Sequence, residues 1–203
     1  MTTRTTATTK ERILQTTAEL FRRQGYTGTG LKQIVAAANA PFGSLYHHFP
    51  GGKEQLGAEV IRSSGAMYQE LIMTILEAAP DIVTGLSDCF TGAAAVLVAT
   101  DFADACPIET VALEVASTND TLRRACADVF ESWIAAGTDH HARAGLPRAK
   151  ARELTILFIT ALEGAFVLSR AMRSTEPLTS AGKYVAAAVS ASMPSKRPRS
   201  HTR

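Results

Sequence analysis

Residues 29–56 constrain the fold of this chain more than any other stretch, because they read as two short helices joined by a tight turn. Apolar side chains recur at helical spacing over residues 31–38, which predicts a helix with one buried face. Asn39 stands where that helix must end, and asparagine tolerates the left-handed conformation better than most non-glycine residues. Pro41 fits the edge of a second helix, where its missing N–H costs least.

The second helix is predicted to have two different sides. Leu45 and Phe49 lie four residues apart and form its buried face. Small or hydrogen-bonding residues occupy the other side, namely Gly43, Ser44, Tyr46 and His47. Two short helices joined by a tight turn make a helix-turn-helix, whose second helix fits the major groove of DNA.

These residues closely resemble the DNA-binding module of the TetR-type transcriptional repressors. That family typically has a Thr before the first helix, an Ile-Ala pair within it, Gly-Ser/Thr-Leu-Tyr-x-His-Phe in the second helix and a Lys soon after. Those places are held here by Thr29, Ile34 with Val35, the segment 43–49 and Lys53. Pro41 and the segment 49–54 (FPGGKE) look like the LmrA/YxaF-like branch of the family.

The resemblance implies the DNA contacts, with two departures from the family pattern. Asn39 replaces the usual glycine of the turn, and Phe42 stands where a lysine is common, which removes a phosphate or base contact. Phe42 and Ser44 are expected to face the bases, and Gly43 permits close backbone approach. The predicted DNA-binding residues are Thr29, Lys32, Gln33, Phe42, Gly43, Ser44, Tyr46, His47 and Lys53.

The remaining chain also follows helical spacing, with few strand-favouring runs, so the predicted fold is all α. We expect a three-helix head on a larger helical body, about nine helices in total. The expected helices span residues 10–24, 31–38, 42–49, 53–79, 81–100, 108–117, 120–144, 148–174 and 180–192. The expected parts of the chain are a flexible arm (1–8), a DNA-binding head (9–55), an effector-binding and dimerisation body (56–193) and a disordered basic tail (194–203); the family-type domain, with the start of the linking helix, covers about 8–68.

The charged residues are distributed unevenly between the expected head and the expected body. Residues 1–55 carry seven Lys or Arg against three Asp or Glu, whereas residues 56–193 carry ten against sixteen, and the last ten residues add four basic groups. A basic head and an acidic body favour one end that binds a polyanion and another with a different task.

The family resemblance also implies a cavity in the body that admits a small effector. Its predicted lining residues are Met67, Phe90, Phe102, Trp133, Phe158, Glu163 and Phe166. The alternative is that these aromatic residues belong to an ordinary core. Because no acidic or metal-binding cluster accompanies them, the sequence favours an apolar or aromatic effector over an ion.

Two recognition helices must enter successive major grooves, so we expect a homodimer on an approximately palindromic operator. The expected interface is made by the last two helices, which contain residues that permit close approach: Gly164, Ala165, Ala181, Ala186, Ala187, Ala188 and Ala191.

Other classes of protein find little support. The histidine pairs 47–48 and 140–141 are adjacent rather than four apart, and no nucleophile elbow, P-loop or metal motif occurs, so we expect no enzyme, no cofactor and no metal. No apolar segment is predicted to span a membrane, the N-terminus lacks a signal-peptide core, and the three cysteines favour a reducing cytoplasm. A DNA-binding regulator without a ligand and an all-α enzyme remain the alternatives to a ligand-released repressor.

Overall fold

The computed structural model of the protein describes residues 7–194 and contains, within that range, nine α-helices and no strand. The predicted all-α fold is therefore confirmed. The helices are α1 (Thr9–Gln24), α2 (Leu31–Ala37), α3 (Phe42–His48), α4 (Gly52–Ala78), α5 (Ile82–Ala99), α6 (Pro107–Val115), α7 (Asp120–Arg143), α8 (Arg148–Met172) and α9 (Glu176–Ser192). The predicted arm and tail lie outside the described residues, apart from positions 7, 8 and 194.

Most predicted helix ends fall within two residues of the observed ones, because the capping signals are local. Thr8 caps α1 and forms a capping box with Glu11. Asn119 caps α7 by accepting the Leu122 amide. The largest error is at α9, which begins at Glu176 instead of residue 180.

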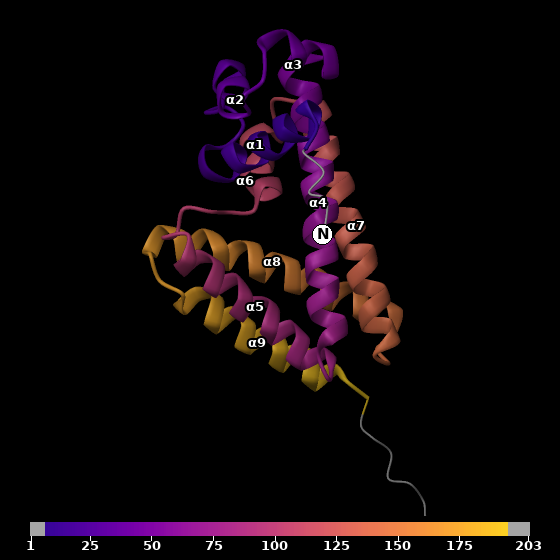
Figure 1. Ribbon diagram of the computed structural model, residues 1–203. Coiled ribbons are helices and arrows are strands. Elements are labelled where there is room, and N and C mark those ends of the chain that lie inside the picture. The colour runs from indigo at the N-terminus through magenta and orange to yellow at the C-terminus, as the bar shows by residue number, and fades with distance from the viewer. Residues whose placement is uncertain (1–6, 195–203) are drawn as a thin grey trace, which may run out of the picture.

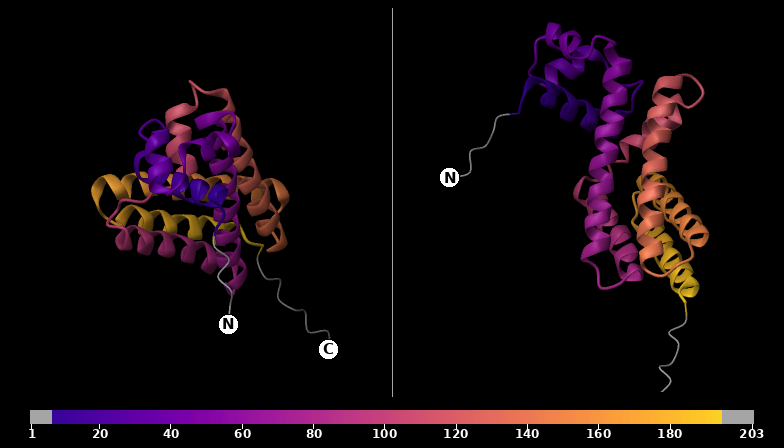
Figure 2. Two further views of the ribbon diagram at one scale, coloured as in Figure 1. Left: turned by 45° about the horizontal axis from the view of Figure 1, so that its top comes forward. Right: turned by 90° about the vertical axis from the view of Figure 1, so that its right-hand side faces the viewer.

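The long helix α4 organises the molecule (Figure 1). Its 27 residues span about 40 Å at 1.5 Å per residue. Helices α1–α3 lie at one end of α4, and α5, α8 and α9 lie beside the other end. Helix α7 runs along α4, as the right-hand view of Figure 2 shows, and packs extensively against it.

The head does not have a core of its own. The buried side chains of α1–α3 and the first half of α4 form one hydrophobic cluster with α6 and the first half of α7. Ile34 and Leu45 of the helix-turn-helix belong to the same cluster as Ile108 and Leu122. The second cluster joins the end of α4 to α5, α8 and α9. Continuous packing therefore links helices α1–α3 to α6 and α7.

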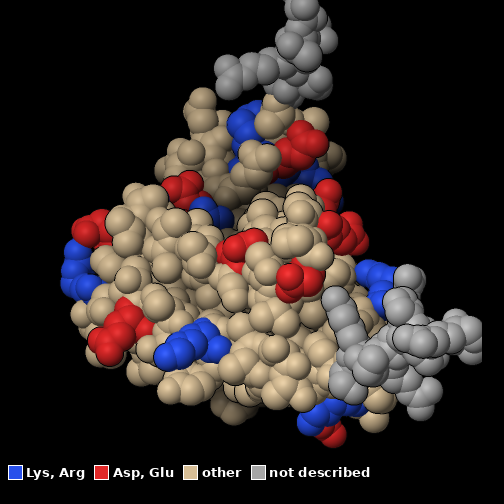
Figure 3. Space-filling model, turned by 90° about the horizontal axis from the view of Figure 1, so that it is seen from below, with Lys and Arg blue, Asp and Glu red and all other residues tan. Residues whose placement is uncertain are grey.

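Two helices are long and apolar enough to cross a membrane by length and composition alone, contrary to the sequence expectation. They are α5 and α8, whose most apolar 18-residue windows have mean hydropathies of 1.7 and 1.6. In the fold, α5 packs against α9 and α4, and α8 packs against α7 and α9. The underside of the body in Figure 3 carries Lys, Arg, Asp and Glu side chains that lie singly rather than in one patch.

Candidate functional site

The predicted helix-turn-helix is formed by α2, α3 and the turn between them. Asn39 adopts the left-handed conformation with φ of 47°, which a short polar side chain tolerates. The Ala40 amide donates a 2.9 Å hydrogen bond to the Val35 carbonyl, and the Ser44 amide donates a 3.0 Å bond to the Pro41 carbonyl. The predicted helix end at Asn39 and the helix start beside Pro41 are confirmed.

The guanidinium of Arg12, on α1, holds this turn from behind. Its Nε donates to the Ala38 carbonyl at 3.2 Å and its Nη2 to the Asn39 carbonyl at 3.4 Å. A cation at the end of a helix satisfies free carbonyls and complements the helix dipole. No local sequence pattern points to this role of Arg12, since its partners lie 26 and 27 residues away in the chain.

Helix α3 separates into the two predicted sides. Leu45 and Phe49 are fully buried, while Phe42 and Tyr46 are 44% and 47% exposed and their ring centroids lie 5.7 Å apart. His47 is exposed beside them. Two exposed aromatic rings and an imidazole on a short helix form a surface suited to an outside partner, because nothing in the described chain covers them.

Gly43 adds room to this surface. It is exposed, and a Cβ atom built on it would meet no atom within 4 Å. Nothing inside the protein therefore requires glycine at this position. Ser44, the next residue, is partly buried.

The other predicted DNA contacts lie on the neighbouring segments. Lys32 and Gln33 are exposed on α2, and the Gln33 amide exchanges hydrogen bonds with Gln24 of α1. The Nζ atom of Lys53 lies 4.2 Å from the centroid of the Tyr26 ring. Burial lowers the pKa of the Lys53 ammonium.

Thr29 differs from the other predicted DNA contacts, because its side chain lies inside the head. It is fully buried, and its hydroxyl donates a 2.6 Å hydrogen bond to the Gly25 carbonyl while accepting one from Gln24. Its amide donates to the Tyr26 carbonyl. Thr29 therefore shapes the turn that leads into α2. Because it lies outside the helices, helical spacing in the sequence could not predict that its side chain is buried.

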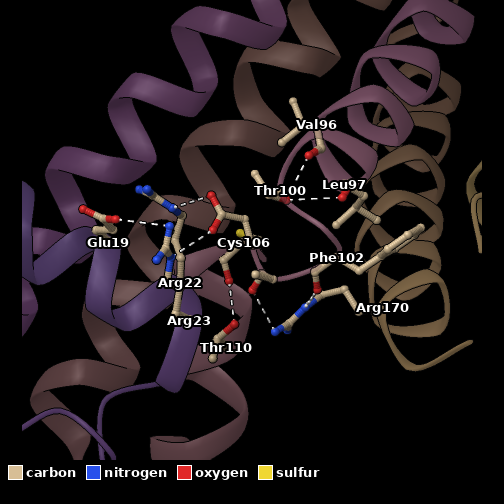
Figure 4. A network of polar contacts seen from close by, with 12 residues as sticks. Glu19, Arg22, Arg23, Val96, Leu97, Thr100, Phe102, Cys106, Thr110 and Arg170 are labelled. Atoms are coloured by element: carbon tan, nitrogen blue, oxygen red, sulfur yellow. Dashed lines mark hydrogen bonds and ion pairs between the residues drawn. The ribbon is translucent and has the colours of Figure 1, made fainter. Parts of the chain in front are cut away.

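Several basic residues of the head are occupied by contacts inside the protein. Lys10 pairs with Glu59 of α4 at 2.9 Å. Arg22 and Arg23 of α1 both reach the carboxylate of Asp104, at 3.4 and 3.5 Å (Figure 4). The positive balance counted in the sequence thus overstates the charge that the head offers to DNA.

A carboxylate of α6 also holds the head. The Glu114 side chain accepts the Tyr26 amide at 3.1 Å and the Thr27 amide at 2.7 Å. These two amides belong to the turn between α1 and α2. Because Glu114 and Asp104 both contact the head, the segment 104–114 joins it to the body.

The connection from α5 to α6 is itself held by α8. Asp101 and Phe102 have positive φ angles of 50° and 60°, which non-glycine residues adopt only when their surroundings enforce it. Arg170 of α8 donates to the Phe102 carbonyl at 3.4 Å and to the Ala103 carbonyl at 3.2 Å (Figure 4). Arg173 pairs with Asp101.

A cavity of about 290 Å³ lies among α4, α5, α7 and α8. Its walls are almost entirely apolar. They include Tyr68, Ile72, Cys89, Ala93, Trp133, Thr155, Phe158, Ile159, Leu162 and Phe166. Its polar lining includes Asp104, His141 and Glu163, and no Lys or Arg side chain lines it.

Four of the seven predicted pocket residues line this cavity: Trp133, Phe158, Glu163 and Phe166. The other three predicted residues do not line it. Met67 is 51% exposed on the outer side of α4. Phe90 is buried against Phe158 and α9, and Phe102 lies under the Arg173 guanidinium. Helical spacing identifies an apolar face, but it does not say whether that face meets a neighbour or a void.

His141, Cys89 and Cys106 also line the cavity. The His141 Nδ1 atom lies 2.8 Å from the Gly137 carbonyl, and burial lowers the pKa of its imidazole. All three cysteines are buried without disulfides, and burial raises the pKa of the Cys106 thiol, which keeps it a weak nucleophile. No group of three or more His, Cys, Asp or Glu residues in the described part of the chain is placed to hold a metal.

Comparisons with known proteins agree with this geometry. A family model described as "Bacterial regulatory proteins, tetR family" matches residues 13–60. A second, "Transcriptional regulator LmrA/YxaF-like, C-terminal domain", matches residues 83–184. The chain is 31% identical to the HTH-type transcriptional regulator LmrA of Bacillus subtilis over 83% of its own length and 90% of that protein. It is 34% identical to the HTH-type transcriptional regulator YxaF of the same organism, over 83% and 88%.

Solved structures show the same fold. A TetR transcriptional regulator from Legionella pneumophila superposes with a TM-score of 0.78, covering 90% of this chain and 97% of that one at 22% sequence identity. At this identity the match concerns the arrangement of the helices alone.

Proposed function

The chain belongs to the TetR family of bacterial transcriptional regulators, in its LmrA/YxaF-like branch, and from this premise we propose that it is a repressor released from its operator by a small apolar or aromatic effector. Like the other members of this family, it is a DNA-binding regulator and not an enzyme. The operator, the effector and the dimer are the parts proposed here.

The proposed DNA-binding head comprises residues 9–55, and its reading surface is α3 with the exposed residues of α2. Phe42 is suited to a thymine methyl group, and Gly43 leaves room for the DNA backbone. Lys32, Tyr46 and Lys53 supply phosphate or groove-edge contacts, which position the head without specifying sequence. The protein acts where the DNA is, in the cytoplasm.

The proposed dimer forms through α8 and α9. Exposed apolar side chains on these helices are Ile156, Leu157, Val167, Leu168, Met172 and Tyr184. A patch of this kind on the surface of a soluble protein indicates an interface. A two-fold axis there presents two α3 helices to one face of a palindromic operator.

The cavity among α4, α5, α7 and α8 is the observation that carries effector release. Residues of α4 form part of its wall, and α4 begins beside α3 in the head. A ligand in the cavity therefore contacts a helix whose other end belongs to the head. A ligand releases DNA only if it binds the non-binding conformation more tightly. A tenfold loss of operator affinity requires about 1.4 kcal/mol of such preference.

The test uses DNA fragments from the protein's own locus. We expect footprints on an approximate palindrome, and release of the fragment by flat apolar molecules that change Trp133 fluorescence. Specific DNA binding that no cavity ligand alters would favour the second candidate, a regulator without an effector. The cavity argues against that candidate, since a core with no ligand is normally close-packed.

A further inference from the structure

Glu163 and His141 both line the cavity, and each has a buried polar atom without a hydrogen-bond partner. An apolar ligand leaves both unexplained, and of the two only Glu163 can carry a negative charge. It projects from the middle of α8 and lines the cavity, and its Oε2 atom is buried without a hydrogen-bond partner. A buried carboxyl group without a partner costs stability. Such a group in an otherwise apolar wall is a candidate contact for a ligand.

The charged groups around Glu163 decide which ligand charge is favoured. The titratable groups that face it are the Cys106 thiol before α6, the Glu109 carboxyl of α6 and the Tyr68 hydroxyl of α4. Asp104 also lines the cavity, but its carboxylate is already paired with Arg22 and Arg23.

Arg170 does not compensate the Glu163 carboxyl group. It favours the charged form of Glu109, and its guanidinium donates to backbone carbonyls of the α5–α6 connection. Among residues 7–194, the cavity wall contains carboxyl groups and no Lys or Arg.

The rest of the wall suits the apolar part of a cation. Tyr68, Trp133, Phe158 and Phe166 present aromatic rings to the cavity. The faces of such rings attract organic cations by about 0.5–2 kcal/mol each.

We propose that this cavity selects a lipophilic organic cation, a molecule with an aromatic or apolar body and a positively charged nitrogen that pairs with the Glu163 carboxylate. The inference rests on the proposed function, in that the cavity is taken as the effector site, and it adds the charge of the effector. An anion would meet the carboxyl groups of Asp104 and Glu163, and a neutral apolar molecule would leave the Glu163 Oε2 atom without a partner.

The protonation of Glu163 gives the proposal a second signature. Burial, and then the charge of Glu109, raises the pKa of Glu163 to about 8 in the empty cavity. At neutral pH a permanent cation must therefore displace the proton. Its affinity should rise about tenfold for each pH unit up to that pKa, and then level off.

The experiment compares phenyltrimethylammonium with its neutral isostere, tert-butylbenzene, on the full chain. The two probes have the same shape and differ in charge, and Trp133 emission and calorimetry report binding. We expect the cation to bind at least fivefold more tightly at pH 8.5, with a smaller preference at pH 6.5. Glu163→Gln, which keeps the shape of the side chain, should abolish the preference. Glu153→Gln, on the exposed side of the same helix, should retain it.

Three outcomes would overturn the proposal: equal or tighter binding of the neutral isostere at pH 8.5, no binding of the cation up to millimolar concentration at that pH, or a cation preference that survives in Glu163→Gln. Failure of the proposed function looks different. If the cation binds through Glu163 but operator affinity does not change, the charge selectivity stands and effector release is wrong.

Discussion

The indole Nε1 of Trp133 donates a 2.8 Å hydrogen bond to the backbone carbonyl of Gly65, in the middle of α4. The same indole lines the cavity. Gly65 belongs to the helix that starts beside α3, so this bond connects a wall of the cavity, the proposed ligand site, to the helix that carries the head. It provides a physical route for coupling, which a mutation can test.

Trp133→Ala should blunt effector release while leaving ligand-free operator binding within about threefold of wild type. Trp133→Phe, which keeps a ring but loses a hydrogen bond contributing about 0.5–1.5 kcal/mol, should show a partial loss. The measurement is the ratio of operator affinities with and without saturating ligand. Phe130→Leu is the control, because Phe130 packs on Trp133 outside the cavity lining. An unchanged ratio in Trp133→Ala would remove Trp133 from the switch.

Lys53→Ala combined with Tyr46→Phe should weaken binding to different operators by a similar factor, about tenfold or more at near-physiological salt, because phosphate contacts carry no sequence information. Changes at Phe42 or Ser44 should instead alter which operator is preferred. Filter binding over a salt series measures both effects. Lys150→Ala, which removes a lysine paired with Glu153 on the body, should change neither. A double variant that binds as tightly as wild type would disprove the assigned contacts.

Gly43→Ala and Gly65→Ala should have opposite consequences. A Cβ at Gly43 meets nothing within the protein, so stability should stay the same or rise by up to about 1 kcal/mol, while operator affinity falls. A Cβ at Gly65 would lie 2.5 Å from Val129 Cγ1, so that variant should lose about 1–3 kcal/mol of stability. Thermal unfolding and DNA titration of both variants check this pair. Undiminished operator affinity in Gly43→Ala would show that the DNA backbone does not approach there.

Leu168→Glu should convert the proposed dimer into monomers, because it places a charge among the exposed apolar side chains of α8. Leu168 is 54% exposed in the isolated chain, so the variant should still fold. Sedimentation at micromolar concentration reports the assembly. Leu113→Glu is the matched control, since Leu113 is 75% exposed on α6 and lies outside the proposed interface. A wild-type protein that sediments as a monomer would contradict the interface.

The contribution of Glu163 to the stability of the protein should fall as pH rises between about 4.5 and 8. The ordinary pKa of a glutamate is 4.5, and in the folded protein burial raises that of Glu163 to about 8. Between these values the folded chain retains a proton that the unfolded chain has released, so each rise in pH favours unfolding, and the effect levels off above about 8. The pKa of Glu109 is raised as well, with the same sign.

Glu163→Gln should therefore gain stability over wild type as pH increases from 5.5 to 8.5. Melting temperatures at constant ionic strength provide the measurement, with Glu153→Gln as the control for an exposed carboxylate on the same helix. Parallel curves for wild type and Glu163→Gln would show that Glu163 titrates as an ordinary glutamate.

The sequence by itself determined the helices, the helix-turn-helix and the family. The left-handed Asn39, the Pro41 start of α3 and the division of α3 into a buried Leu45 side and an exposed Tyr46 side all follow from residues within one or two turns of each other. Helical periodicity, caps and breakers act over that range, so they can be read without knowing the fold.

Only the tertiary structure decided which residues meet across the chain. Arg12 caps a turn 26 residues away, Arg22 and Arg23 are taken up by Asp104, and Glu114 holds amides 87 and 88 residues distant. The cavity likewise depends on how four helices diverge, which is why Trp133 and Glu163 line it while Phe90 and Phe102 do not. Local patterns fix which face of a helix is apolar, but the geometry of packing decides whether that face is filled by a neighbour, an ion pair or a ligand.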